Sequence, residues 1–355
     1  MMRNLPQLAS TVQRNCDISD ARYAGDYGLC TFLLKMREYY RWENELPLSR
    51  TLARDDIGDW LTTREQMWDR IEADVFAPLP LACGALDPFD AVAANRELVP
   101  QGCVYGAGYG RFHKPVFFLG RLLRVEQRAR YTVLISSCEY ARELAAPPAM
   151  LQGWTIHVRQ ESVRRYLWEK IEEWQWRKQG SAMARALAGY DFSADFESAL
   201  ERMADNEIET MVLHELGEAM AGELLGAAWE ELAVSVARSR AEPVARAVRD
   251  LLADCLSTLP VLLERAALPA LHFYFATFDA PRRQLFPQAV VAYEQFSRSG
   301  DLDPLRQIVQ ERKARWLAAA QGLLALAPAA RDAAVNALLE KDTVPAPQRG
   351  AAATV

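Results

Sequence analysis

Residues 205–218 read Asp-Asn-Glu-Ile-Glu-Thr-Met-Val-Leu-His-Glu-Leu-Gly-Glu, and they lie inside a predicted helix from about Ser193 to Leu225. Asp195 falls in the first turn of this helix, where an acidic side chain interacts favourably with the helix dipole. Gly226 follows the last helical residue, and glycine is common directly after a helix end. A helix of this length predicts that the second half of the chain is built from packed helices.

Apolar residues also recur at helical spacing on both sides of this segment. Val163, Leu167 and Ile171 share one face of a helix expected from Glu161 to about Lys178. The other helices expected from the same periodicity cover residues 28–46, 57–76, 228–240, 243–266, 283–298, 303–325 and 330–340.

A different pattern occupies the middle of the N-terminal half. Val116–Leu119 and Tyr131–Ile135 are short apolar runs, and Trp154–Val158 alternates with a period of two. Short runs of this kind, separated by turn residues, indicate antiparallel strands. We therefore predict a mainly α fold, a multi-helix protein with a small antiparallel β meander inserted near residues 103–158.

The same patterns predict how the chain is divided. Residues 1–160 form an N-terminal helical region with the β meander, and residues 161–341 form a C-terminal helical domain. Residues 342–355 contain two prolines, a glycine and three alanines in succession, which predicts a disordered tail.

Charge and hydropathy exclude several classes of protein. The 355 residues include 41 basic and 47 acidic side chains, a formal net charge of −6, so no nucleic-acid partner is expected. The longest charge-free apolar stretch, Ala266–Phe278, has 13 residues, whereas a membrane-spanning helix needs about 20. Residues 1–20 lack the apolar segment of a signal peptide. We expect a cytoplasmic bacterial protein with no membrane partner.

Two further features bear on cofactors. The six cysteines are isolated from one another, which is typical of neither a disulfide framework nor a structural zinc site. Gly106, Gly108 and Gly110 form a glycine run, but Pro115 and a predicted strand follow it rather than a helix. In the dinucleotide-binding fingerprint and in the P-loop, the glycines open a helix. The context here is different and favours a tight turn between strands. No nucleotide cofactor is therefore expected.

The candidate site lies on the long helix. Glu207, Met211, His214 and Glu218 follow one another at helical spacing and share one side of the helix. His214 and Glu218 are one turn apart, so both side chains can reach a common metal ion. Glu215 follows His214 directly and points about 100° further round the helix.

The segment His214-Glu-Leu-Gly-Glu218 resembles the HExxH helix of the zincins, the zinc-dependent metallopeptidases. This resemblance implies that His214 is a metal ligand and that Glu215 is the general base that activates water. The sequence departs from the zincin motif at Glu218, which stands where that motif has its second histidine. A carboxylate also binds zinc, but the change makes iron or manganese more competitive.

A third ligand has to come from elsewhere, and Glu207 and Asp254 are the candidates. Asp250 and Asp254 are one turn apart on a later predicted helix, and apolar residues surround Asp254. A buried carboxylate needs a partner, which is either a metal ion or an arginine such as Arg246 or Arg249.

These residues favour a metal-dependent hydrolase with a small-molecule or peptide substrate. One alternative is a non-catalytic helical interaction protein in which the acidic helix face is solvated. A second is an oxidoreductase with a di-metal carboxylate centre, although the Glu-x-x-His order typical of such centres is absent at His214. The sequence leaves open whether the protein is an enzyme, and it indicates no oligomeric state.

The chain as a whole also resembles an uncharacterised family of bacterial hypothetical proteins. The resemblance rests on the polar and aromatic segment Cys16–Glu43, on Ala-Pro-Pro-Ala-Met at 146–150 and on the segment His214–Glu218. It implies no activity.

Overall fold

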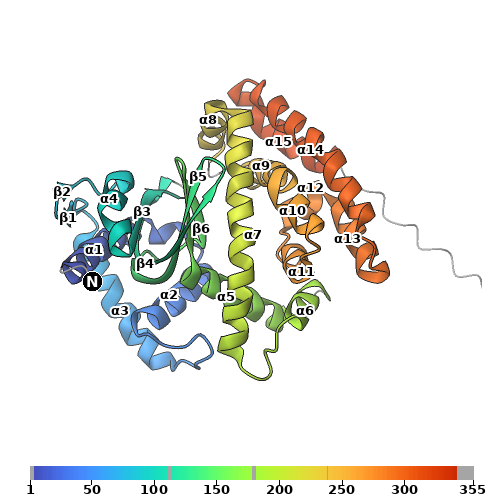
Figure 1. The fold of residues 1–355 in the computed structure, drawn as a ribbon. Helices are drawn as coiled ribbons and strands as arrows, with labels where there is room; N and C mark the ends of the chain where they lie inside the picture. Colours follow the sequence, from blue (N-terminus) through green and yellow to red (C-terminus); the bar gives the residue numbers. More distant parts are fainter. Residues whose placement is uncertain (1–3, 111–112, 178–180, 238, 342–355) are drawn as a thin grey trace, which may run out of the picture. The chain divides into compact units, whose positions relative to one another are not determined.

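The computed structural model describes residues 4–110, 113–177, 181–237 and 239–341. The chain forms two units, residues 1–215 and 216–355, and the long helix α7 (Phe196–Leu225) passes through the point of division (Figure 1). The tail predicted at 342–355 lies outside the described residues. The predicted domains 1–160 and 161–341 stay a prediction.

Unit 1 contains a sheet of five strands, and its topology shows that the predicted fold class is wrong. The strand order is β3-β4-β5-β7-β6, and β5 pairs with β7 in parallel, so the sheet is mixed and is not an antiparallel meander. A second, two-stranded sheet of β1 and β2 lies outside residues 103–158. The strands are β1 (Leu79–Leu81), β2 (Gly84–Leu86), β3 (Cys103–Tyr109), β4 (Pro115–Arg128), β5 (Tyr131–Arg142), β6 (Ala149–Gln152) and β7 (Thr155–Arg159).

The physical reason for this error lies in the connection after β5. Residues 143–148 carry the chain past the position next to β5 and on to the edge of the sheet, where β6 forms. Strand β7 then returns to the position between β5 and β6 and pairs with both. Periodicity identifies strands but does not encode which strand inserts between two others.

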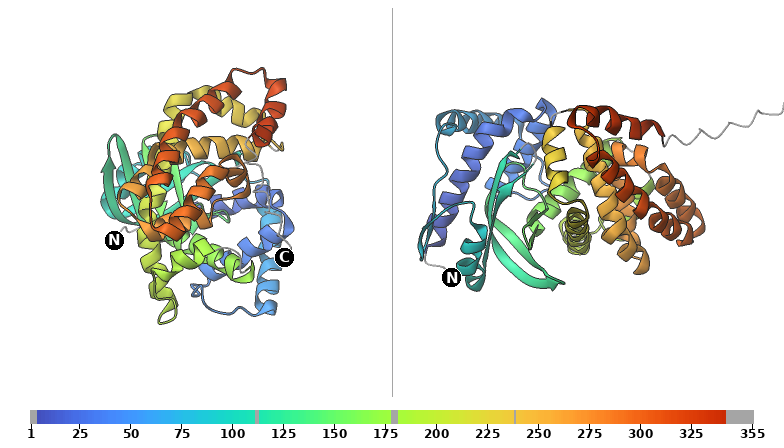
Figure 2. Two further views of the ribbon diagram at one scale, coloured as in Figure 1. Left: turned by 90° about the vertical axis from the view of Figure 1, so that its right-hand side faces the viewer. Right: turned by 90° about the horizontal axis from the view of Figure 1, so that it is seen from above.

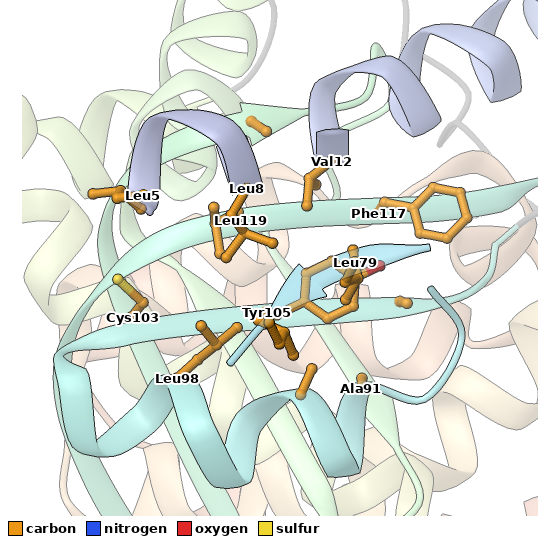
Figure 3. Packing of buried hydrophobic residues seen from close by; sticks show 14 of the residues in the cluster. Leu5, Leu8, Val12, Leu79, Ala91, Leu98, Cys103, Tyr105, Phe117 and Leu119 are labelled. Atoms are coloured by element: carbon orange, nitrogen blue, oxygen red, sulfur yellow. The ribbon is translucent and has the colours of Figure 1, made fainter. Parts of the chain in front are cut away.

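Helices cover one face of this sheet. Apolar residues of α1 recur three or four positions apart, and this stripe packs with α4 and β1 against alternating residues of β3 and β4 (Figure 3). The stripe of α1 is Leu5, Leu8, Val12 and Cys16. The helices of unit 1 are α1 (Leu5–Tyr23), α2 (Leu29–Glu43), α3 (Arg54–Ile71), α4 (Ala91–Leu98), α5 (Gln160–Arg177), α6 (Ser181–Ala188) and the first part of α7.

Only the last residue of the glycine run lies between strands: Gly110 follows β3, and its N–H donates to the carbonyl of Lys114 just before β4 at 2.8 Å. Gly106 and Gly108 lie within β3. A Cβ at Gly106 would lie 2.1 Å from the ring of Phe118 on the paired strand, so only glycine leaves room for that ring. Phe118 lies on the sheet face opposite the one that α1 covers, and this face therefore packs closely at Gly106.

Unit 2 is helical throughout the part that the structure describes. Helix α14 packs against α9 and α13 (Figure 2), and a single π-helical turn, η4, joins α9 to α10. The elements that follow α7 are α8 (Ala227–Ser235), α9 (Glu242–Ala253), η4 (Asp254–Thr258), α10 (Leu259–Glu264), α11 (Leu268–Ala276), α12 (Ala280–Leu285), α13 (Pro287–Ser299), α14 (Asp303–Leu324) and α15 (Pro328–Lys341). Among the described residues, no helix has both the length and the apolar character required to cross a bilayer.

Candidate functional site

The predicted metal-binding residues of α7 are brought together only in part. His214, Glu218 and Asp250 each offer one ligand atom, and these atoms lie within 4.8 Å of one another. Asp250 comes from α9, whereas the third ligands predicted from the sequence were Glu207 and Asp254. Glu215, the predicted base, is buried on the same helix.

A close approach of two helices accounts for the position of Asp250. A Cβ at Gly217 would lie 2.3 Å from the carbonyl oxygen of Ala253, so glycine at this position lets α7 and α9 pack closely. A cation already lies at the two carboxylates, because Nη2 of Arg249 is 2.5 Å from Oε1 of Glu218 and 3.9 Å from Oδ1 of Asp250. A metal ion here would compete with this guanidinium.

The other two predicted ligands have different surroundings. Glu207 is fully buried, and burial raises the pKa of its carboxyl to about 8. It lies two helical turns before His214, which corresponds to a rise of about 10 Å. Asp254 lies in the π-helical turn, where the hydroxyl of Tyr274 donates to its Oδ2 at 2.7 Å and Arg282 Nη1 is 3.4 Å away. Arg282 is therefore an arginine partner of Asp254, which the sequence did not indicate.

A second candidate site lies within unit 1, at a cavity of about 880 Å³. Its wall comes from α2 and the loop after it, from β4 and β5, and from the first turns of α5. Charged side chains dominate this wall. They are Glu38, Arg41, Glu43, Glu45, Arg121, Glu139, Arg142, Glu161, Arg164, Arg165 and Glu197.

A β-bulge in β5 places two of these charges on one sheet face. Gly120 pairs with Glu139, Leu119 with Ala141, and Phe118 with Arg142, so Tyr140 is the extra residue of the bulge. Residues three apart in a regular strand point to opposite faces. The bulge instead turns Glu139 and Arg142 to the face that carries Phe118.

Glu139 is held by a buried ion pair. Arg159, from β7, donates to its two carboxylate oxygens through Nε (2.9 Å) and Nη2 (2.7 Å). The hydroxyl of Ser162 donates to Glu139 at 2.6 Å, and Nη1 of Arg159 binds Glu143 at 3.0 Å. Burial opposes ionisation of Glu139, but Arg159 and Arg142 together lower its pKa below the ordinary value.

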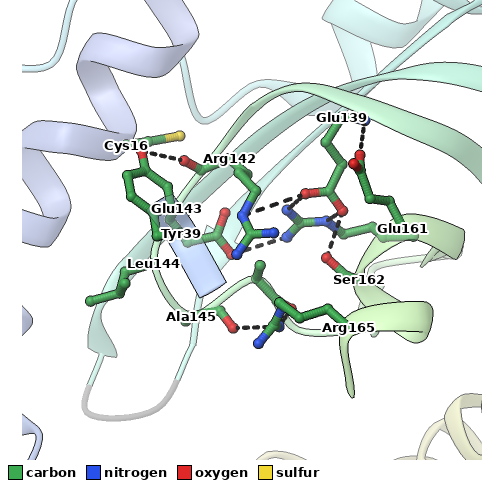
Figure 4. Close-up of polar contacts among 12 residues, drawn as sticks. Cys16, Tyr39, Glu139, Arg142, Glu143, Leu144, Ala145, Glu161, Ser162 and Arg165 are labelled. Atoms are coloured by element: carbon green, nitrogen blue, oxygen red, sulfur yellow. Dashed lines mark hydrogen bonds and ion pairs between the residues drawn. The ribbon is translucent and has the colours of Figure 1, made fainter. Parts of the chain in front are cut away.

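Arg142 differs from Arg159 although both side chains are buried, with 1% and 0% exposed. Its Nε and Nη2 make no hydrogen bond to any described residue, and Nε is 3.9 Å from Glu139 (Figure 4). The guanidinium packs near the rings of Tyr39 and Trp42. Burial lowers the pKa of Arg142, and the positive charge of Arg165 lowers it further.

Glu161 is the second unusual group of the wall. Its Oε2 accepts the backbone N–H of Glu139 at 2.7 Å, which leaves Oε1 available to a ligand (Figure 4). Burial raises the pKa of Glu161 to about 7, and the negative charge of Glu139 contributes in the same direction. A carboxyl that titrates near neutral pH beside a cavity can take up or release a proton there.

The remaining buried or half-buried charges of the wall have protein partners. Arg41 donates to two backbone carbonyls, Arg164 binds Glu197, and Arg165 donates to the carbonyls of Ala145 and Ala146. Among the described residues of the wall, Arg142 leaves two buried polar atoms without a hydrogen bond, Nε and Nη2. Four other charged residues leave one each: Oε2 of Glu38 and Nε of Arg41, Arg164 and Arg165.

Sequence reasoning missed this cavity. Its residues are scattered between Gln13 and Glu197, and none of them belongs to a recognisable motif. The available signal is the presence of charges in two largely apolar strands, Glu139 and Arg142 in β5 and Arg159 in β7, because a charge at an inward strand position needs a partner.

Comparison with known proteins identifies the family. Residues 7–159 match the N-terminal domain, and residues 164–343 the C-terminal domain, of a family of unknown function (DUF6866). The chain belongs to this family. No curated protein and no solved structure matches the chain. The cavity wall draws residues from both matched segments.

Proposed function

We propose that this protein binds a small organic anion, a carboxylate or a phosphate ester, in the cavity of unit 1. The observation that carries the proposal is the buried guanidinium of Arg142, which lines the cavity while its Nε and Nη2 make no hydrogen bond to the described residues.

A buried guanidinium whose nitrogens lack hydrogen bonds is costly. The rings of Tyr39 and Trp42, and the carboxylate of Glu139 at 3.9 Å, do not replace the hydrogen bonds to water that Arg142 loses. Two further guanidinium groups, those of Arg159 and Arg165, act unfavourably on the charge of Arg142. An anionic ligand group removes both costs at once. Arginine also suits carboxylate and phosphate groups, since its planar fork donates two parallel hydrogen bonds.

The size and lining of the cavity indicate an organic molecule rather than a bare inorganic ion. About 880 Å³ lies within the usual range for small-molecule sites. Trp42, Leu46, Pro47 and Leu48 add an apolar side to the charged wall. Such a lining accommodates a ligand that has an anionic end and an apolar body.

The experiment is a thermal-shift and calorimetric screen with carboxylic acids, dicarboxylic acids and phosphate monoesters. Ligands that bind the wild type are expected to bind Arg142→Met at least tenfold more weakly. Arg124→Gln, which removes an exposed arginine from the same sheet, should bind them as the wild type does. Equal binding by Arg142→Met, or binding of none of these anions by the wild type, would overturn the proposal.

The second candidate function is the metal-dependent hydrolase, favoured by the proximity of His214, Glu218 and Asp250. In this alternative these residues hold a divalent ion, zinc or else iron or manganese, and Glu215 accepts a proton from water. Arg249 counts against it, because the ion has to displace a guanidinium from Glu218.

Elemental analysis of untagged protein tests this alternative. One ion per chain is expected, with loss of the ion in both His214→Ala and Asp250→Asn and retention in Asp254→Asn. Protein that contains no stoichiometric metal, and that shows no thermal shift with Zn²⁺, Fe²⁺ or Mn²⁺, rules the metal site out.

A further inference from the structure

We infer that the ligand of the unit 1 cavity is a zwitterion of the amino acid class, whose carboxylate binds Arg142 and whose ammonium group binds Glu161. The inference rests on the proposed anion site and adds the second charge of the ligand.

The geometry assigns two complementary groups to one cavity. Both groups flank Glu139: Arg142 approaches its carboxylate, and Glu161 accepts its backbone N–H. Glu139 itself cannot serve the ligand, since Arg159 and Ser162 already occupy its oxygens. The wall therefore offers one donor group and one acceptor group of opposite charge, side by side.

Arg142 and Glu161 do not satisfy each other. Neither forms an ion pair with the other among the described residues, although their opposite charges interact through the intervening space. We infer that a ligand with one charge of each sign binds both groups, since both line the same cavity. A simple carboxylate leaves the acceptor of Glu161 unused, and a simple amine leaves the donors of Arg142 unused.

Glu161 lies among charges of both signs, because Arg142 and Arg164 favour its ionised form whereas Glu139 opposes it. The carboxylate of Glu139 is a like charge that disfavours a second negative charge at Glu161. An ammonium group placed at Oε1 offsets this repulsion and holds Glu161 in its ionised form.

The test uses isothermal titration calorimetry with the twenty L-amino acids and a set of dipeptides. Each binder is then compared with its N-acetyl derivative, which lacks the cation, and with its carboxamide, which lacks the anion. The free zwitterion is expected to bind at least tenfold more tightly than either derivative. Glu161→Gln should remove the advantage over the N-acetyl form, because a neutral amide does not attract an ammonium group.

Proton release gives an independent readout. Ammonium binding ionises Glu161, so up to about half a proton per site should be released at pH 7, measured from the dependence of binding heat on buffer ionisation enthalpy. This release should be absent in Glu161→Gln.

The outcomes distinguish a failure of the zwitterion inference from a failure of the proposed anion site. If N-acetyl amino acids or plain carboxylates bind as tightly as any zwitterion, the anion site stands and the zwitterion is wrong. If neither anions nor zwitterions bind, the proposed function fails as well.

Discussion

Arg159 and Glu139 form a two-point ion pair in the interior of unit 1, with N–O distances of 2.9 and 2.7 Å and no exposure of either side chain. Arg142 lies beside this pair, 3.9 Å from Glu139, and makes no comparable bond. Two buried arginines thus share one carboxylate, but only one of them is bound to it. Arg159 is therefore a structural cation, whereas the binding site that we propose assigns Arg142 to a ligand.

The first prediction compares the two arginines. Arg159→Met should cost about 3–5 kcal/mol, because it leaves Glu139 and Glu143 buried without their cation. Arg142→Met should leave stability unchanged or raise it by about 1 kcal/mol, since it removes a buried charge that lacks hydrogen bonds. Urea unfolding of the ligand-free variants measures both effects. Equal losses in the two variants would show that Arg142 is structural.

The second prediction concerns the pH dependence of stability at Glu161. Its pKa of about 7 in the folded protein exceeds the ordinary glutamate value, so the folded state retains a proton that the unfolded chain releases. The stability contributed by that proton is present below about pH 4.5 and is lost as the pH rises through 7. The stability of Glu161→Gln relative to the wild type should therefore increase by about 2 kcal/mol between pH 4.5 and 8. A constant difference across this range would contradict the assignment.

The third prediction concerns acid stability at His157, on β7. Burial lowers the pKa of His157 to about 4, and Arg159 contributes to this shift. The neutral imidazole packs edge-on against the ring of Phe118 with centroids 5.5 Å apart. The associated stability is present above about pH 6.5 and is lost as the pH falls through 4.

His157→Leu removes this titration, so the variant should lose less stability than the wild type between pH 7 and pH 4. The expected difference is about 3 kcal/mol. Denaturant titrations at both pH values measure it. If the two proteins lose stability in parallel, His157 is not the group that titrates.

The fourth prediction concerns the contact between α7 and α9. Gly217→Ala should destabilise the protein by about 1–3 kcal/mol, because the added methyl group overlaps the backbone of Ala253. Gly222→Ala is the matched control on the same helix: no atom lies within 4 Å of its added Cβ, and alanine is the better helix former. The control should gain up to about 1 kcal/mol. Thermal unfolding of the two variants distinguishes them, and a loss of equal size in both would place the effect in the helix itself.

The candidate sites differ in how far local sequence predicts them. His214 and Glu218 lie one turn apart on α7, and helical geometry alone brings such residues together. Asp250 was not predicted as the third ligand, because its approach depends on Gly217 and on the packing of α9. The sequence could not group the charged residues of the cavity, Glu139, Arg142 and Glu161. A bulge at Tyr140 determines where the first two point, and the start of α5 determines the position of Glu161.

The sequence alone predicted most of the helices from α7 onward, because a period of 3.6 residues and local end signals are properties of neighbouring residues. It did not predict α11, and it treated α9, η4 and α10 as one helix. Tertiary structure decided the insertion of β7 between β5 and β6, and it brought Arg159 to Glu139. Pairing between strands depends on contacts among distant residues and on the path of the connecting chain. The charged cavity arises from those long-range pairings, because only the folded chain removes these charges from water and brings them together.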